Sequence, residues 1–287
     1  MATYKIITDS SCDFTKEQYA KLDLIYVPLT LLYKGESHDS FTENQELKEF
    51  YDGIRAGEMP TTSAANPDNW ARAMEPVLEE GKDILCMTFT SGLSTTHQSA
   101  VIAAEELKEK YPERTILVVD TLCAALGQGL LVRYACKKRD EGMGLTDLAA
   151  WVEENKLKLC HWVTIDDLNH LKRGGRVSAT TAFVGTMIGI KPIIRVDDNG
   201  KLETCSKIRG RKAAIEYLAD QLDKHIENCE MIHIAHGDCP GDAAKLEELI
   251  RAKRPEIGDI LTGYVGGVIG AHTGPGVLVV FFLGNHR

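Results

Sequence analysis

The sequence predicts an α/β protein of two domains, the first built on a parallel sheet and the second on a mostly antiparallel sheet with helices. Strand-like and helical runs alternate up to about residue 157, and this βαβα order is typical of a parallel sheet with helices on both faces. Further on, the run Asp-Asp-Asn-Gly at 197–200 lies between two strand-like segments, which is a strong hairpin signal. A chain of 287 residues is long enough for two domains.

The first predicted domain, residues 1–157, contains short apolar runs that we interpret as strands and longer runs that we interpret as helices. The strands are expected at 4–11, 25–32, 83–88 and 115–120, and the helices at about 16–21, 42–57, 95–110, 124–142 and 145–158. Thr42 to Gln45 has the pattern of a capping box for the second of these helices. Residues 60–68 contain three consecutive hydroxyl side chains bounded by prolines, so we expect a loop there.

The second predicted domain, residues 158–287, begins after a charged segment at 153–158. Strands are expected at 159–165, 191–196, 201–205, 231–235 and 257–261, and helices at 168–173, 211–226 and 242–253. The hairpin signal at 197–200 indicates that the sheet of this domain is largely antiparallel.

The stretch 262–282 carries no formal charge over 21 residues and holds one histidine, His272. Its many glycines and Pro275 would break a helix exposed to lipid, so we interpret the stretch as protein interior and not as a membrane span. We expect a glycine-rich apolar approach, a tight turn at 272–276 and a strand at 277–282. The sequence therefore places one polar side chain in apolar surroundings.

Composition excludes several classes of protein. The chain is 44% hydrophobic and 26% charged, and 33 basic against 42 acidic residues give a net charge of -9, which disfavours general binding to nucleic acid or to anionic membranes. The first residues lack the hydrophobic region of a signal peptide, so we expect a cytoplasmic protein without integral membrane association. The eight cysteines form no C-x-x-C pair, and we expect no metal site.

Polar side chains follow several predicted strands. Asp9 and Ser10 lie at the polar end of the first predicted strand and Asp13 follows it, where capping and ligand contact both require short oxygen-bearing side chains. Ser91 and Ser94 lie between a predicted strand and a helix start. Free amides at such a start attract carboxylates or phosphates, although either serine could simply cap the helix.

Five segments in this order resemble the DegV family of fatty-acid-binding proteins. They are TDSSCD at 8–13, TTS at 61–63, SGLS at 91–94, LNHLKRGGR at 168–176 and HTGPG at 272–276. The resemblance spans nearly the whole chain and implies a two-domain fold that holds one long-chain fatty acid between its domains, with no cofactor and no catalytic residue of its own. It also implies a partner, because such proteins serve as the lipid-carrying subunit of bacterial fatty acid kinase. The separate ATP-binding subunit of that kinase resembles dihydroxyacetone kinase and converts the bound carboxylate to an acyl phosphate.

The resemblance also implies which residues contact the carboxylate. The matching positions are a hydroxyl of Thr61 or Thr62, Ser91 with Gly92, and His272 in the turn that continues with Thr273. The chain departs from the family where a second glycine often follows the serine turn, since it has Thr95, and at 64–67, where the family often has a glutamine-proline pair. We expect neutral donors at this site and no lysine or arginine, because hydroxyls, amides and a histidine can hold a carboxylate while leaving one oxygen free to attack ATP. His272 could add a conditional positive charge by taking up a proton.

The acyl chain requires an apolar wall, which we expect from the second domain. The candidates, each of which could equally be ordinary core, are Phe183, Met187, Ile188, Ile190, Val268 and Ile269. A basic cluster that contains Arg209, Arg211 and Lys212 stands out in an acidic protein. We predict that it docks the kinase subunit, although a solvated face is the ordinary reading of such a cluster.

Three other functions are possible. In a serine-dependent acyl hydrolase acting on lipid esters, Ser91 or Ser94 would be the nucleophile with a histidine base, but the chain lacks the G-x-S-x-G elbow. A metal or phosphate site could involve His233 and His236, which would point to opposite faces of a strand. A transcriptional or degradation regulator has little support from the net charge.

Overall fold

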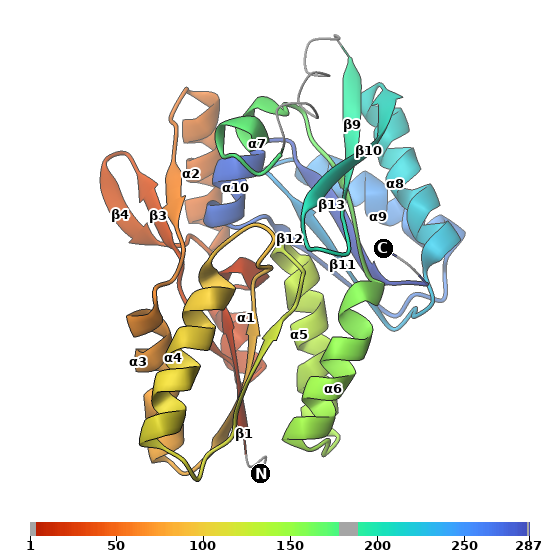
Figure 1. Cartoon of the computed structure of the whole chain (residues 1–287). Coiled ribbons are helices and arrows are strands. Elements are labelled where there is room, and N and C mark those ends of the chain that lie inside the picture. The colour runs from red at the N-terminus through yellow and green to blue at the C-terminus, as the bar shows by residue number, and fades with distance from the viewer. Residues whose placement is uncertain (1–3, 178–188, 286) are drawn as a thin grey trace.

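The computed structural model describes residues 4–177, 189–285 and 287, and its first half is built on a four-stranded parallel sheet (Figure 1). The strand order is β2-β1-β6-β7, and every neighbouring pair runs parallel. The strands are β1 (Tyr4–Asp9), β2 (Ile25–Val27), β6 (Asp83–Thr88) and β7 (Ile116–Asp120). The predicted parallel sheet is therefore confirmed, and the carboxyl ends of its strands share one edge.

Helices cover both faces of this sheet. Ile6 and Leu85 belong to the apolar cluster that includes α5 and α6, whereas the neighbouring Ile7 and Ile84 belong to the cluster that includes α3 and α4. This alternation is the two-residue period of a pleated strand. The helices of this half are α1 (Lys16–Lys21), α2 (Asn44–Arg55), α3 (Pro67–Glu79), α4 (Thr96–Lys110), α5 (Ala125–Asp140) and α6 (Leu145–Asn155). Within the described ranges, no helix is both long and apolar enough to cross a bilayer.

Two expectations about these helices were wrong. The capping box at Thr42 does not form: α2 begins after Glu43, which makes no side-chain cap, and the Thr42 hydroxyl instead donates to the Glu43 carboxylate. Helix α3 is absent from the predicted elements. The sequence nevertheless contains start signals for this helix. Asn66 caps it, and Pro67 occupies the first turn, where the missing N–H of proline would have no intrahelical acceptor.

A small antiparallel sheet of order β4-β3-β5 corrects two further expectations. Its strands are β3 (Thr30–Tyr33), β4 (Glu36–Asp39) and β5 (Thr61–Ser63). The single strand expected at 25–32 is divided between two sheets, and Pro28, which has no N–H for a sheet ladder, lies at the division. The expected loop at 60–68 contains β5, because its backbone pairs with β3 in the register Leu31 opposite Thr62.

The second half is built on a six-stranded sheet of order β10-β9-β8-β13-β11-β12. Its strands are β8 (Leu159–Thr164), β9 (Ile190–Val196), β10 (Leu202–Arg209), β11 (Met231–His236), β12 (Asp259–Tyr264) and β13 (Leu278–Leu283). All neighbouring pairs are antiparallel except β11 with β12. The prediction of a mostly antiparallel second sheet is confirmed, including the hairpin whose turn lies at 197–200.

The central strands of this sheet are covered on both faces. Along β13, Val279 and Phe281 pack on the side of α5, whereas Leu278 and Val280 pack on the side of α8 (Arg211–His225) and α9 (Pro240–Lys253). Strands β8 and β13 are consequently buried along their whole length, as expected of strands with two covered faces.

The junction of the two halves is a short 3₁₀ turn, Lys156–Lys158, which joins α6 to β8. The apolar core nevertheless continues across it, since Leu130 of α5 and Phe281 of β13 belong to the same cluster. The domain boundary at residue 157 therefore stays a prediction.

The stretch 262–282 differs in part from the expected glycine-rich approach, tight turn and strand. Strand β12 extends to Tyr264, and residues Gly267–Thr273 form a helix, α10, so that His272 lies in a helical turn. The helix packs against α2, β3 and β5 of the first half and against α7 (Asn169–Arg173). Glycine is required for this close packing at Gly270, where a Cβ would lie 2.5 Å from the Tyr51 hydroxyl. The expected strand follows as β13.

Candidate functional site

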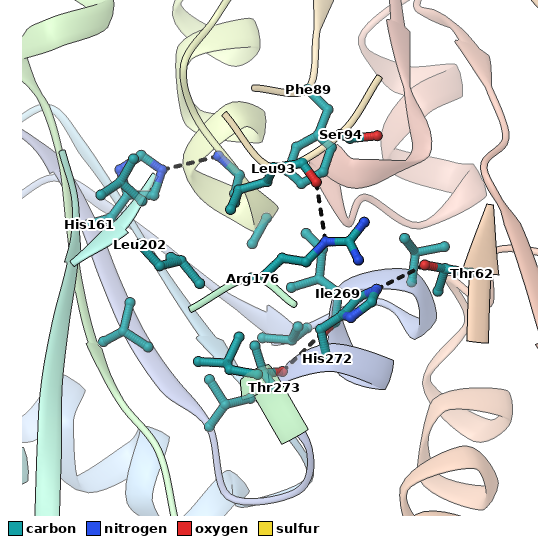
Figure 2. Close-up of a pocket in the computed structure, with 18 of the residues that line it drawn as sticks. Thr62, Phe89, Leu93, Ser94, His161, Arg176, Leu202, Ile269, His272 and Thr273 are labelled. Atoms are coloured by element: carbon teal, nitrogen blue, oxygen red, sulfur yellow. Dashed lines mark hydrogen bonds between the residues drawn. The ribbon is translucent and has the colours of Figure 1, made fainter. Parts of the chain in front are cut away.

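A cavity of about 380 Å³ lies between the two halves, at the carboxyl end of the parallel sheet. One side is formed by β5, by the turn after β6 and by α10, and the other by the inner face of the six-stranded sheet. Figure 2 shows that apolar side chains surround the greater part of this space. Its apolar lining includes Leu29, Phe89, Val163, Ile194, Leu202, Val268, Ile269, Val277, Val279 and Phe281.

Two polar side chains meet at the cavity from distant parts of the chain. The hydroxyl of Thr62 lies 2.8 Å from Nε2 of His272, and both side chains line the cavity (Figure 2). Because β5 is a strand, Thr61 and Thr62 point to opposite sides; Thr61 is exposed and is not among the lining residues of the described chain. The structure thus brings Thr62, and not Thr61, to His272.

His272 is neutral at pH 7 in this environment. Burial, assisted by the nearby positive charge of Arg176, lowers the pKa of the imidazole to about 4. The surroundings of His272 thus penalise the imidazolium in the protein without ligand, and a positive charge that depends on a bound carboxylate stays a prediction. Thr273, the next residue, also lines the cavity, and its hydroxyl donates to the Ile269 carbonyl at 3.2 Å.

Arg176 supplies a positive charge that the sequence interpretation missed. Its Nε donates to the Leu93 carbonyl at 3.2 Å, and a further N–H donates to the Gly174 carbonyl. Figure 2 shows the side chain lying across the cavity between Leu93 and His272. In the sequence, Arg176 belongs to a basic run that is ordinarily solvated, and no spacing signal separates it from its basic neighbours. The expected all-neutral set of donors is thus incomplete.

The serine turn is arranged differently from the expected cradle of free amides. The Ser91 N–H donates to both oxygens of the Asp120 carboxylate at 3.2 Å, and the Gly92 N–H donates to the Thr90 hydroxyl at 3.1 Å. Ser94 acts as a cap, since its hydroxyl accepts the Thr96 N–H. Ser91 lines the cavity and Gly92 does not, so the Ser91 side chain is the candidate contact from this turn.

Gly92 has a different role in the packing. A Cβ at this position would lie 2.5 Å from the carbonyl oxygen of Asn199 and 2.6 Å from that of Gly200. The turn of the β9–β10 hairpin therefore rests directly on the serine turn, and the Thr90 hydroxyl donates to the Gly200 carbonyl at 3.0 Å. Glycine is required at residue 92 by this close approach of two backbones.

The predicted acyl-chain wall is present in part. Val268 and Ile269 line the cavity, whereas Ile190, at the start of β9, does not. Phe183, Met187 and Ile188 lie outside the described residues. The wall also includes a residue that we had not singled out, His161, whose ring faces Phe281 edge-on at 5.2 Å. Burial lowers the pKa of His161 to about 3, so this imidazole is uncharged at neutral pH where it lines the cavity.

Among the described residues, neither Ser91 nor Ser94, the serines of the hydrolase alternative, is hydrogen-bonded to a histidine; the hydroxyl–histidine pairs among them are Thr62–His272 and Thr88–His97. His272 is bonded to Thr62, and Nε2 of His161 accepts the Ala124 N–H at 3.2 Å. The Ser94 hydroxyl is bonded to Thr96. The geometry therefore offers no support for the hydrolase alternative.

The predicted docking cluster divides into two kinds of residue. Arg211 is only 20% exposed and is paired with Asp242 at 2.8 Å and with Asp166 at 3.6 Å. Arg209 is exposed at the end of β10, and Lys212 is 85% exposed. Arg211 thus ties α8 to its neighbours, while the other two remain open to a partner.

Comparison with known families agrees with this architecture. A family model described as an uncharacterised protein of the DegV family matches residues 3–285. The chain belongs to the DegV family. It is 45% identical to a DegV domain-containing protein of Clostridium perfringens over 290 residues, covering 100% of this chain and 99% of the relative. It is 36% identical to a DegV domain-containing protein of Streptococcus pyogenes serotype M3, with 99% of each chain covered.

Solved DegV structures have the same fold. A fatty-acid-binding DegV family protein from Thermus thermophilus superposes with a TM-score of 0.86 at 29% identity, over 97% of this chain and 98% of that one. DegV from Bacillus subtilis, described as a fatty acid binding protein, superposes with a TM-score of 0.83 at 28% identity, over 98% and 99% of the two chains. The two-part DegV fold predicted from sequence is thus confirmed.

Proposed function

We propose that this protein binds one long-chain fatty acid in the cavity, with the carboxylate toward Thr62, Ser91 and His272 and the acyl chain along the apolar wall. The observation that carries the proposal is a cavity of about 380 Å³ with mostly apolar walls, in which the Thr62–His272 pair and Arg176 are gathered. The two DegV proteins described as fatty-acid-binding, at 28–29% identity over nearly the full chain, support it.

The two ends of a fatty acid match the two kinds of surface. Burial of the chain contributes about 0.8 kcal/mol per methylene group, so the apolar wall provides most of the affinity. The carboxylate is costly to bury without partners. Arg176 supplies the positive charge, because His272 is neutral before the ligand binds, and the hydroxyls of Thr62 and Ser91 supply donors.

We further propose that the protein has no catalytic step of its own and presents the carboxylate to a separate ATP-dependent kinase subunit. In that step a carboxylate oxygen attacks the γ-phosphorus of ATP, the bond to ADP breaks, and acyl phosphate and ADP leave. Arg209 and Lys212 are the docking candidates that remain exposed, and a partner carrying ATP phosphates would be attracted to them. We place this reaction in the cytoplasm.

Native mass spectrometry of the purified protein tests lipid binding. We expect one bound long-chain fatty acid per chain, retained under gentle desolvation and removed by solvent extraction. A protein that purifies without lipid and takes up no added hexadecanoic acid would refute the proposal.

Charge reversal tests the docking surface. Arg209→Glu with Lys212→Glu should reduce kinase-coupled acyl phosphate formation about tenfold, while the affinity for fatty acid stays the same. The matched control is Lys108→Glu, an exposed lysine of α4 in the other half. Turnover equal to that of the parent protein would exclude this face as the docking site.

A further inference from the structure

The segment Asp9–Asp13, which begins at the last residue of the inner strand β1, is buried and lies outside the cavity lining of the described residues. Sequence alone left capping and ligand contact open for this segment. Capping is what the structure shows in part: Asp9 caps the 3₁₀ turn Ser10–Cys12, and Asp13 ends it in the left-handed conformation with φ of 55°. Three side chains of the segment also contact backbone groups far away in the sequence, two of them through hydrogen bonds.

The first of these bonds reaches the serine turn. One carboxylate oxygen of Asp9 accepts the Ser11 N–H at 2.9 Å, and the other accepts the Phe89 N–H at 2.7 Å. Phe89 is the first residue after β6 and lines the cavity two positions before Ser91. Asp9 thus sets where the serine turn leaves the sheet.

The second bond reaches the strand pair that carries Thr62. The hydroxyl of Ser10 accepts the Leu29 N–H at 2.9 Å. Leu29 lines the cavity and directly precedes β3, in which Leu31 is paired with Thr62 of β5. Ser10 therefore constrains the position of Thr62 through the backbone hydrogen bonds that pair β3 with β5.

The third contact reaches the helix that carries His272. Oδ1 of Asp13 lies against the backbone of Gly266, the N-cap residue directly before α10, whose amide opposes the rise in the pKa of Asp13 that burial causes. The approach is so close that a Cβ on Gly266 would lie 2.4 Å from Oδ1 of Asp13. Helix α10 is short, so an anchor at its first turn also determines the position of His272 in its last turn.

We infer that the Asp9–Asp13 segment positions the carboxylate-binding residues, by tying the serine turn, the β3–β5 pair and α10 to the end of one buried strand. The three elements come from residues 29–63, 89–94 and 266–273; the segment is hydrogen-bonded to the first two and packed against the N-cap of the third. Asp9, Ser10 and Asp13 are positioning residues and do not touch the ligand. The inference rests on the proposed function of the cavity and explains how its polar groups are brought into one arrangement.

A comparison of two probes with equal chains separates positioning from general stability. Hexadecanoic acid and 1-hexadecanol share the apolar chain and differ at the head group, so the ratio of their affinities reports on the carboxylate site alone. We expect the parent protein to prefer the acid at least about tenfold. Asp13→Ala should reduce this preference about tenfold, which is the size expected when the ligand carboxylate loses one hydrogen bond. The affinity for the alcohol should stay within about threefold of that of the parent protein.

Asp13→Asn provides the conservative rescue. Its amide oxygen can take the place of the carboxylate oxygen beside the Gly266 backbone, and asparagine tolerates the left-handed conformation, so the preference for the acid should return. Ser10→Ala removes a different contact, the hydrogen bond from the Leu29 N–H, with a smaller change of side chain. It replaces Asp13→Ala in the test if that variant is insoluble. Thr15→Ala is the matched control, because Thr15 caps α1 in the same region by accepting the Gln18 N–H and is not among the residues that line the cavity.

The outcomes distinguish the two proposals. A parent protein that binds acid and alcohol equally would refute carboxylate recognition by the cavity. A parent that prefers the acid, together with folded Asp13→Ala and Ser10→Ala variants that keep the full preference, would overturn the positioning role. Equal loss of both probes in these variants would likewise overturn it, because it would indicate a collapsed cavity.

Discussion

The hydroxyl of Thr62 and Nε2 of His272 lie 2.8 Å apart although 210 positions separate them in the sequence. This contact joins β5 of the first half to α10 of the second, across the cavity wall. The two residues can therefore act on one ligand oxygen only when both elements are in place.

Replacement of the hydroxyl tests this pair directly. Thr62→Val keeps the size of the side chain and its strand preference but removes the donor, so we expect the affinity for hexadecanoic acid to fall about tenfold. Thr61→Val is the control, because Thr61 is exposed on the opposite side of the strand. Binding curves measured for both variants should differ; a loss confined to Thr61→Val would contradict the assignment.

A single added methyl group at Gly174 should displace His272. A Cβ there would overlap the imidazole ring, although the backbone φ of -71° is open to alanine. We expect Gly174→Ala to weaken carboxylate binding at least about tenfold, since the ring must leave its position. In Gly241→Ala, a Cβ meets no atom within 4 Å, and fatty acid affinity should stay unchanged. Equal fatty acid affinities in Gly174→Ala and Gly241→Ala would contradict a role of the His272 imidazole in binding the carboxylate.

Removal of the Arg176 charge should raise the pKa of His272. The guanidinium lowers that pKa in addition to the larger effect of burial. Arg176→Met should therefore raise the pKa of His272 above about 4, and burial should keep it below 6.5. Titration of the His272 ring by NMR measures the change. Arg173→Met removes a neighbouring charge that is paired with His170, and it should leave the titration as it was.

Stability should depend on pH through the same histidine. The pKa of His272 is about 4 in the folded protein against 6.5 in the unfolded chain, so below pH 6.5 the unfolded chain binds more protons. The contribution of His272 is thus complete above pH 6.5 and is lost as the pH falls from 6.5 to 4. A loss on the order of 3 kcal/mol follows from the difference between these two pKa values. Denaturant unfolding at pH 7 and pH 4.5 should show a smaller difference in His272→Gln than in the parent; equal differences would contradict the buried neutral state.

Elements with strong local patterns were predictable. Strand β6 covers Asp83–Thr88 as expected, and α4 begins at Thr96, one residue later than predicted. The hairpin of β9 and β10 turns at 197–200. In each case apolar periodicity or turn chemistry within a few residues is sufficient, because the backbone conformation is favoured locally.

Elements that depend on distant partners were not predictable in this way. Strand β5 has only three residues, and it is a strand because β3 pairs with it. Helix α10 was expected to be an irregular approach because four of the residues 263–270 are glycines, and glycine disfavours helices. It is helical because packing against α2 and β3 uses the absence of side chains.

The local sequence was sufficient for the two kinds of sheet and for the order of most elements, and the family resemblance supplied the short list of candidate polar residues. Three features depend on the packing of the chain. Thr62 and not Thr61 lines the cavity, burial lowers the pKa of His272, and Arg176 lies in the cavity wall. The physical reason is that orientation on a strand edge, burial and charge environment depend on groups far away in the sequence. A residue's type limits the chemistry it can perform, and its distant neighbours decide which part of that chemistry is available.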